Sequence, residues 1–174
     1  MTLRQILTEP NEILRKKSLP VDSVDKDLQI LMDDMLETMY AAPGIGLAAI
    51  QVGIPKRIIV LDIEQKEGHK KPLFLVNPEI IQKSKNLSTY EEGCLSVPGQ
   101  FAEINRPDKC HVKYLDYYGE KKEINAEGML ATCIQHEIDH LEGILFIDYL
   151  SKLKKTMIIK KLSKQKKVLE RIVV

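Results

Sequence analysis

The chain has 174 residues, of which 44% are hydrophobic and 29% charged, and its formal net charge is +1. This composition fits one globular domain with a sizeable core, and the lack of any run of 18 apolar residues excludes a membrane-spanning helix. The charge is uneven, because residues 151–174 carry eight lysines and one arginine against one glutamate, a net of +8 that leaves −7 elsewhere. Such a basic tail is typical of a segment that meets an anionic partner.

Cysteine usage and the first 20 residues point to a reducing compartment. Cys94, Cys110 and Cys133 are an odd number of cysteines, and residues 1–20 contain acidic side chains but no apolar signal core. These features disfavour a disulfide scaffold and export. We therefore expect a cytoplasmic protein whose thiols are structural or bind metal.

Hydrophobic periodicity predicts the elements that precede residue 127. The first 20 residues form an extended arm, and Asp25 caps a helix whose apolar side chains recur at spacings of three and four up to Met39. Runs of β-branched residues bounded by turn residues predict strands at 57–63, 73–77, 79–83, 111–118 and 121–126. His69 falls in a polar loop and His111 in a strand, so we expect neither to bind metal.

The segment GIGLAAIQVG at 44–53 is richer in glycine than a plain scaffold requires. A glycine pair lets the backbone approach a ligand closely, and the lack of a following Gly-Lys-Ser/Thr excludes a P-loop. Gln51 is a single amide among small apolar residues, where an unpaired amide would be costly. It is either a satisfied structural amide or a donor aimed at a substrate oxygen.

The segment TCIQHEIDHLEG at 132–143 contains a metal-binding pattern and is predicted to form a mostly buried helix. His136 and His140 are four residues apart and share one helical face, where two imidazoles can hold one divalent metal. Glu137 is rotated by about 100° from His136, so it is a poor ligand but can reach a metal-bound water as general base. Gly143 follows where a helix end favours positive φ.

A catalytic metal usually has three protein ligands and one open position. The position where metzincins place a third histidine is Phe146, and nothing around Asp148 marks it as a ligand. Upstream, Cys94 lies in the tight segment EEGCLSVPG at 91–99 and would complete the set as a thiolate. Its rival is Cys133, one turn before His136, but three ligands along one helix would make a crowded site.

These elements predict an α+β fold of mostly antiparallel strands packed around a central metal-binding helix, with N-terminal and C-terminal helices. Residues 1–150 would form a catalytic metallohydrolase core. Residues 151–174 would form a basic helix appended to the same single domain.

Three motifs resemble the signature motifs of the peptide deformylase family in order and spacing. They are GIGLAAIQ at 44–51, EGCLS at 92–96 and QHEIDHLEG at 135–143, preceded by ILxxPxxxLR at 6–15. The resemblance covers essentially the whole chain and is closest to the bacterial class with a C-terminal helix. Asn11 and Thr132 depart from residues common in the family, and neither belongs to the chemistry.

The resemblance implies the metal and its ligands. Cys94, His136 and His140 would bind one ion per chain, natively Fe(II), with Zn, Ni or Co as substitutes and a water in the fourth position. Ligand types alone would favour zinc, since zinc is the usual ion in a tetrahedral site with sulfur and nitrogen ligands.

The resemblance also implies the reaction. The enzyme would be a hydrolase of protein biosynthesis that removes the N-formyl group from the initiator methionine of nascent chains co-translationally and releases formate. Glu137 would act as general base and acid, while the Leu95 N–H and the Gln51 amide would stabilise the oxyanion.

A methionine side chain needs an elongated apolar pocket. By resemblance, Ile45, Met129 and Cys133 form its walls, and Gly46 contacts the substrate backbone.

Three other functions remain open at this level. A zinc endopeptidase lacks its third downstream ligand here, and a binding module with a structural metal would need a fourth ligand and would have no use for Glu137. A nucleophilic Cys94 with a histidine base would leave the second histidine without a role.

The basic tail of residues 151–174 allows two interpretations of its role. Leu153, Met157, Ile158, Leu162, Val168 and Leu169 recur at roughly helical spacing, so the tail is either a solvated helix packed on the domain by this stripe or a docking element. The family resemblance implies ribosomal RNA near the exit tunnel as its partner. The lack of aromatic residues argues against a membrane surface, and we expect no DNA partner. Catalysis should survive truncation after about Lys160.

Overall fold

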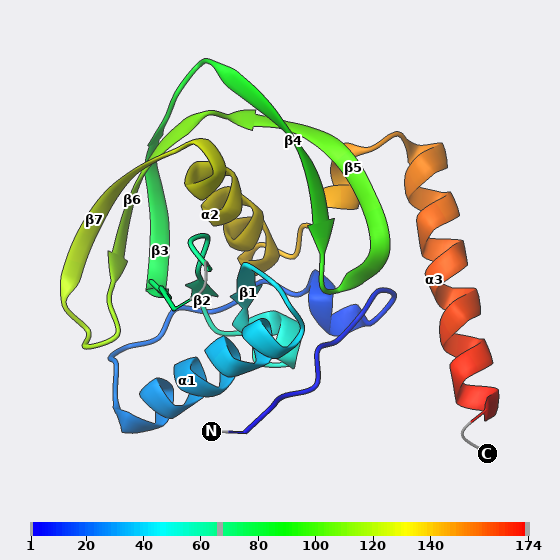
Figure 1. The fold of residues 1–174 in the computed structure, drawn as a ribbon, viewed down its shortest axis with the longest axis horizontal. Helices are drawn as coiled ribbons and strands as arrows, with labels where there is room; N and C mark the ends of the chain where they lie inside the picture. Colours follow the sequence, from blue (N-terminus) through cyan, green and yellow to red (C-terminus); the bar gives the residue numbers. More distant parts are fainter. Residues whose placement is uncertain (1, 66–67, 173–174) are drawn as a thin grey trace.

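The computed structural model describes residues 2–65 and 68–172, and its antiparallel strands enclose one central helix (Figure 1). One sheet has the order β1–β2–β3–β6–β7, and β4 pairs with β5 in a hairpin. The strands are β1 (Gly46–Ala48), β2 (Ile58–Leu61), β3 (Leu73–Lys83), β4 (Leu87–Cys94), β5 (Val97–Pro107), β6 (Lys109–Leu115) and β7 (Lys121–Glu127). The helices are α1 (Lys26–Ala41), α2 (Gly128–Leu141) and α3 (Lys152–Ile172), with short 3-10 turns η1 (Glu12–Arg15), η2 (Ala49–Val52) and η3 (Phe146–Tyr149). The predicted fold class is confirmed.

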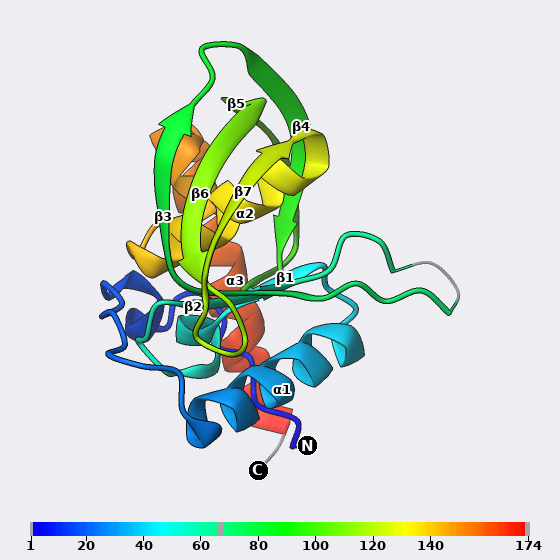
Figure 2. The ribbon, with the colours of Figure 1, turned by 90° about the vertical axis from the view of Figure 1, so that its left-hand side faces the viewer.

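The inner strand β2 is covered by a helix on each face. Ile58 and Val60 pack in a cluster with α1, while Ile59 and Leu61 pack in a cluster with α2. Successive side chains of a strand point to opposite faces, so a fully apolar run is what a strand between two helices requires. Figure 2 shows α1 and α2 on opposite sides of this part of the sheet. Within residues 2–65 and 68–172, no helix combines the length and apolarity needed to cross a bilayer.

Helix α1 begins where the sequence predicted. The Asp25 side chain accepts a hydrogen bond from the Leu28 N–H at 2.8 Å, which satisfies one of the free donors of the first turn. Of the predicted apolar stripe, Leu36 is partly buried, and the other members are buried, namely Leu28, Leu31, Met32, Met35 and Met39. The prediction of a capped helix with a methionine-rich core face is confirmed.

Strand β3 is longer than predicted. The sequence indicated two strands separated at Pro78, but one strand runs through this residue with a register shift between Val76 and Glu79. Asn77 takes a positive φ of 50° there, and its amide bonds both the N–H and the carbonyl of Val21. These two bonds hold the irregular backbone at the point where proline cannot donate to the ladder.

The β4–β5 hairpin was missed by the sequence analysis, which treated residues 91–99 as a tight irregular segment. Polar side chains dominate β4, and Pro98 and Gly99 fall within β5, so local pattern does not mark either strand. The hairpin arches over α2 (Figure 1) and shifts register between Gly93 and Cys94. It thereby delivers Cys94 from a distant part of the chain to the central helix.

Helix α3 lies at the outer edge of the molecule beside β5 (Figure 1). Leu162 is buried in a cluster with Val97, Phe146 and their neighbours, and Ile158 packs against this cluster. The other members of the expected packing stripe remain exposed, with exposed fractions of 71% for Leu153, 61% for Met157, 47% for Val168 and 65% for Leu169. Only the middle of the stripe therefore holds the helix to the body.

Candidate functional site

Helix α2 carries five of the predicted site residues, Met129, Cys133, His136, Glu137 and His140, and both of its ends are set by glycines. Gly128 has φ 61° and Gly143 has φ 74°, conformations that side chains with a Cβ rarely adopt. A Cβ on Gly143 would collide with the Arg15 carbonyl of η1. Asn11 caps η1 through the Ile13 N–H at 3.0 Å, so the arm is not extended throughout as expected. The packed turn fixes where α2 ends and hence where its histidines lie.

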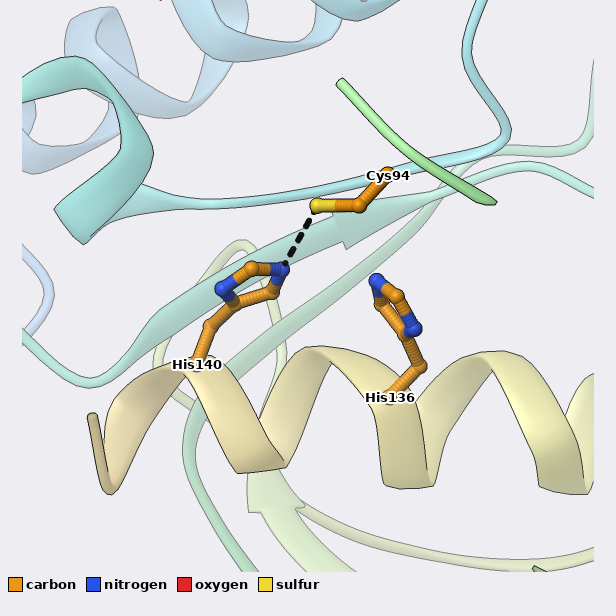
Figure 3. Close-up of side chains that lie close together, drawn as sticks. All are labelled: Cys94, His136 and His140. Carbon is orange, nitrogen blue, oxygen red and sulfur yellow. Dashed lines mark hydrogen bonds between the residues drawn. The ribbon is translucent and has the colours of Figure 1, made fainter. Parts of the chain in front are cut away.

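Cys94, His136 and His140 converge across the gap between the hairpin and α2 (Figure 3). Their ligand atoms all lie within 4.8 Å of one another, and Cys94 Sγ is 3.2 Å from His140 Nε2. One sulfur and two imidazole nitrogens at this spacing fit a single Zn²⁺ or Fe²⁺ ion. Burial lowers the pKa of His140 well below its usual range, so its ring is neutral and can offer a lone pair.

A buried carboxylate orients one of these histidines. Glu92 Oε1 lies 2.8 Å from His136 Nδ1, which leaves Nε2 of that ring for a metal. Arg106 donates to both oxygens of Glu92, from Nε at 2.7 Å and from Nη2 at 3.0 Å. Burial raises the pKa of Glu92, but the bonds from His136 and Arg106 outweigh it and hold that pKa below its ordinary value.

The sequence analysis missed both Glu92 and Arg106. Glu92 had a detectable signal, since it is an acidic residue two positions before an expected thiolate ligand. Arg106 had none, because only the hairpin pairing brings it to Glu92.

Glu137 points into the site from the flank of α2 and is 4% exposed. Burial raises the pKa of its carboxyl to about 7, near the value at which a general base is most effective. A Cβ on Gly46 would collide with the Glu137 carboxylate, which explains a glycine at that position. Glu137 Oε2 is buried without a hydrogen-bond partner among the described residues, so it is available to a substrate or water.

The Gln51 amide is fixed beside the candidate ligands. Its Oε1 accepts from the Ala48 N–H at 2.8 Å, and its Nε2 donates to Ser96 Oγ at 3.0 Å and lies 3.6 Å from Cys94 Sγ. The side chain is thus paired, and its N–H₂ end faces the site. The first alternative left by the sequence, a satisfied structural amide, is confirmed, while the second, a donor aimed at a substrate oxygen, stays a prediction.

The predicted site residues other than His140 share one cavity of about 290 Å³. It is lined by Ile45, Gly46, Gln51, Cys94, Leu95, Met129, Cys133, His136 and Glu137 together with Tyr90, Phe101, Thr132 and other hairpin and loop residues. Ile45 and Met129 are 43% and 42% exposed, whereas Cys133 is buried. His140, 1% exposed, is not part of the lining. Tyr90 and Phe101 were not predicted because their strands were not.

Larger hollows of about 450 and 490 Å³ lie along β3, β6 and β7, but none of the candidate ligands lines them. Size alone therefore does not locate the site. In the 290 Å³ cavity, Cys94 and His136 meet the buried carboxyl of Glu137.

Cys133 lies beside the ligands without belonging to their cluster. Burial raises the pKa of its thiol to about 12, so it stays protonated and is a poor ligand at neutral pH. We expect Cys133→Ala to retain the metal content of the parent protein and measurable turnover, as determined by metal analysis after anaerobic purification. A variant stripped of metal would reverse the choice between Cys94 and Cys133.

Comparisons with known proteins point to one family. A family model described as polypeptide deformylase matches residues 3–156. The chain is 66% identical over 166 residues to a peptide deformylase of Pelagibacter ubique, covering 95% of this chain and 96% of that protein. It is 58% identical over 171 residues to one of Maricaulis maris, covering 98% of each. A crystal structure of peptide deformylase from Ehrlichia chaffeensis with actinonin superposes with a TM-score of 0.89 at 46% identity, covering 95% and 98% of the two chains.

Proposed function

The chain belongs to the peptide deformylase family, and on that premise we propose that it hydrolyses the N-formyl group of the initiator methionine on nascent polypeptides. The observation that carries the proposal is the cluster of Cys94, His136 and His140, two of which line one cavity together with Glu137. The products are formate and a peptide with a free amino group.

The proposed metal ligands are Cys94 Sγ and one ring nitrogen of each of His136 and His140. We assign Fe(II) as the native ion, as the family resemblance implies, and Zn, Ni and Co as substitutes that the same donor set accepts. When bound, the ion supplies Lewis acidity that brings the pKa of a water molecule to roughly 7.

Glu137 is the proposed proton carrier. Its carboxylate takes a proton from the attacking water, whose oxygen adds to the formyl carbon. The carboxylic acid so formed then protonates the amine nitrogen as the carbon–nitrogen bond breaks. Burial supports this assignment, because a carboxyl with a pKa of about 7 can both accept and donate a proton near neutrality.

Two donors are proposed for the oxyanion of the tetrahedral intermediate. The Leu95 N–H directly follows Cys94 in the chain, and Gln51 Nε2 lies 3.6 Å from Cys94 Sγ. Each donor of this type is worth about 3–4 kcal/mol of transition-state stabilisation. The Ala48 N–H holds the other end of the Gln51 amide, so this donor needs little reorganisation.

The test is formate release from formyl-Met-Ala-Ser under anaerobic conditions, with iron quantified in the same preparation. We expect release that scales with iron content. Cleavage of casein with no formate release would replace the proposal by an endopeptidase. Binding of metal with neither activity would indicate a structural site.

The side-chain pocket predicts substrate preference. Ile45, Met129 and Cys133 line the cavity beside Gly46, and a missing methylene in such a pocket costs about 1–3 kcal/mol. We expect kcat/KM for a formyl-Gly peptide to be more than about 10-fold below that for formyl-Met, while formyl-norleucine, which has a similar shape, stays close to methionine. Equal rates for glycine and methionine would rule out the pocket.

We propose ribosomal RNA as the partner of α3. Seven of its eight lysines are exposed, and the eighth, Lys155, is paired with Asp148. A net charge of +8 over residues 151–174 supports an anionic partner, whose phosphates would make binding steeply salt-dependent.

A truncated chain tests the docking proposal. A cut after Lys160 would remove Leu162, which is buried against the body, so a cut after Ser163 separates docking from packing better. This cut removes Lys164, Lys166, Lys167 and Arg171, so we expect the shortened chain to deformylate free peptides normally but to co-sediment with ribosomes less than the full-length chain at low salt. Equal pelleting of the truncated and full-length chains would contradict the proposal.

A further inference from the structure

We propose that Asp139 and Tyr149 are positioning residues for the metal centre, acting through Arg106 and Glu92 on His136. The inference rests on the proposed metal assignment and adds residues that do not touch the ligand cluster. A continuous hydrogen-bonded chain links the half-exposed Tyr149 hydroxyl of η3 to the buried His136 ring of α2.

In the part of this hydrogen-bonded network nearest the candidate ligands, the orientation of His136 depends on Arg106. Glu92 Oε1 is shared between His136 Nδ1 at 2.8 Å and Arg106 Nη2 at 3.0 Å, while Oε2 accepts from Arg106 Nε at 2.7 Å. The guanidinium fork therefore fixes the plane of the carboxylate that faces the histidine. The side chains of Arg106 and Glu92 are 4% and 5% exposed, so solvent does not compete for these bonds.

Asp139 balances the charge of Arg106. Arg106 Nη1 donates to Asp139 Oδ2 at 2.8 Å, on the side of the guanidinium away from Glu92. Without Asp139, the single positive charge of Arg106 would cancel the negative charge of Glu92. With it, the three side chains carry a net charge of −1, and the carboxylate at the inner end remains available to stabilise a cation bound through His136. A buried charge that loses its partner is strongly unfavourable, so the three charges act as a unit.

Tyr149 secures the outer end. Its hydroxyl donates to the same Oδ2 of Asp139 at 2.7 Å, and its ring lies 5.0 Å from the Arg106 guanidinium carbon. The Tyr149 ring thus covers the Arg106 guanidinium where α2 and the hairpin do not enclose it fully. The Tyr149 hydroxyl orients the Asp139 carboxylate, which balances the charge of Arg106.

The test compares full-length Asp139→Asn and Tyr149→Phe with the parent by Co(II) affinity, measured by chelator competition, and by the absorption bands of the bound Co(II). Removing the outer partner of a ligand typically weakens metal affinity by about 10–100-fold. We expect about 10-fold for Asp139→Asn and about threefold for Tyr149→Phe, with shifted Co(II) bands in both. Urea unfolding of the metal-free proteins measures stability separately.

Tyr117→Phe is the matched control, because the Tyr117 hydroxyl donates to Asp33 at 3.0 Å and belongs to the α1 side of the molecule. It should change stability without changing Co(II) affinity or spectrum. Unchanged affinity and spectra in Tyr149→Phe would overturn the inference even if Asp139→Asn fails to fold. A parent that binds no Co(II) through a thiolate would instead refute the proposed metal site, and this inference with it.

Discussion

Replacing Glu137 by alanine is expected to lower the turnover number by about 10²–10⁴-fold, the usual effect of removing a general base, while the protein keeps its metal. The reason is geometric: Glu137 lies on the flank of α2, off the face that carries His136 and His140, and it is not part of the cluster of candidate ligands. Formate release and metal content should be measured on the same anaerobic preparation.

Two variants sharpen this result. Glu137→Gln keeps the shape of the side chain but cannot take a proton, so it should lose as much turnover as Glu137→Ala. Glu142→Ala, at the end of the same helix, removes a carboxylate that is paired with Lys17 and Arg57 and should leave turnover unchanged. A folded Glu137→Ala protein without metal would show that Glu137 is a ligand.

Spacing within one element predicted the two histidines and Glu137, whereas Cys94 and Gln51 were chosen by residue type, and Ile45, Gly46 and Leu95 by the family resemblance. A spacing of four on a helix places two histidines together whatever surrounds them, and the same helix places Glu137 on the adjacent flank. Helix α1 is likewise determined by its own residues, through the Asp25 cap and the apolar spacing that follows.

The parts that sequence did not predict depend on pairing between distant segments. Strands β4 and β5 are recognisable only once paired, since neither alternates cleanly between apolar and polar residues. Glu92 meets Arg106 through the pairing of β4 with β5, and it meets His136 because the hairpin closes over α2. Local periodicity contains no information about such contacts, so the environment of a predicted ligand is harder to predict than the ligand itself.

The choice between Cys94 and Cys133 involves both spacing within a helix and pairing between distant segments. Crowding along a single helix favoured Cys94 from sequence, but its delivery to α2 required a hairpin that was not predicted. In the structure Cys94 joins the ligand cluster, whereas Cys133 is a buried thiol beside it.

Cys94→Ser and His136→Ala are each expected to lose the metal and, with it, activity. A serine hydroxyl does not ionise near neutral pH, so it cannot replace a thiolate, and alanine offers no ligand atom. Loss of a direct ligand should weaken affinity by more than the ~10–100-fold that follows loss of an outer partner. Metal analysis and chelator competition with Co(II) measure both variants.

The controls use the same residue types outside the cluster. His111→Ala removes an imidazole that pairs with Glu123 on β7, 2.7 Å away, and should leave metal content unchanged. Cys133→Ala removes a thiol outside the cluster and should likewise leave metal content unchanged. If Cys94→Ser kept its metal while Cys133→Ala lost it, the ligand set would lie wholly on α2, and the β4–β5 hairpin would have no direct part in binding. If Cys94→Ser and His136→Ala both kept it, the metal would be bound elsewhere, and the convergence of Cys94, His136 and His140 would be a feature of packing.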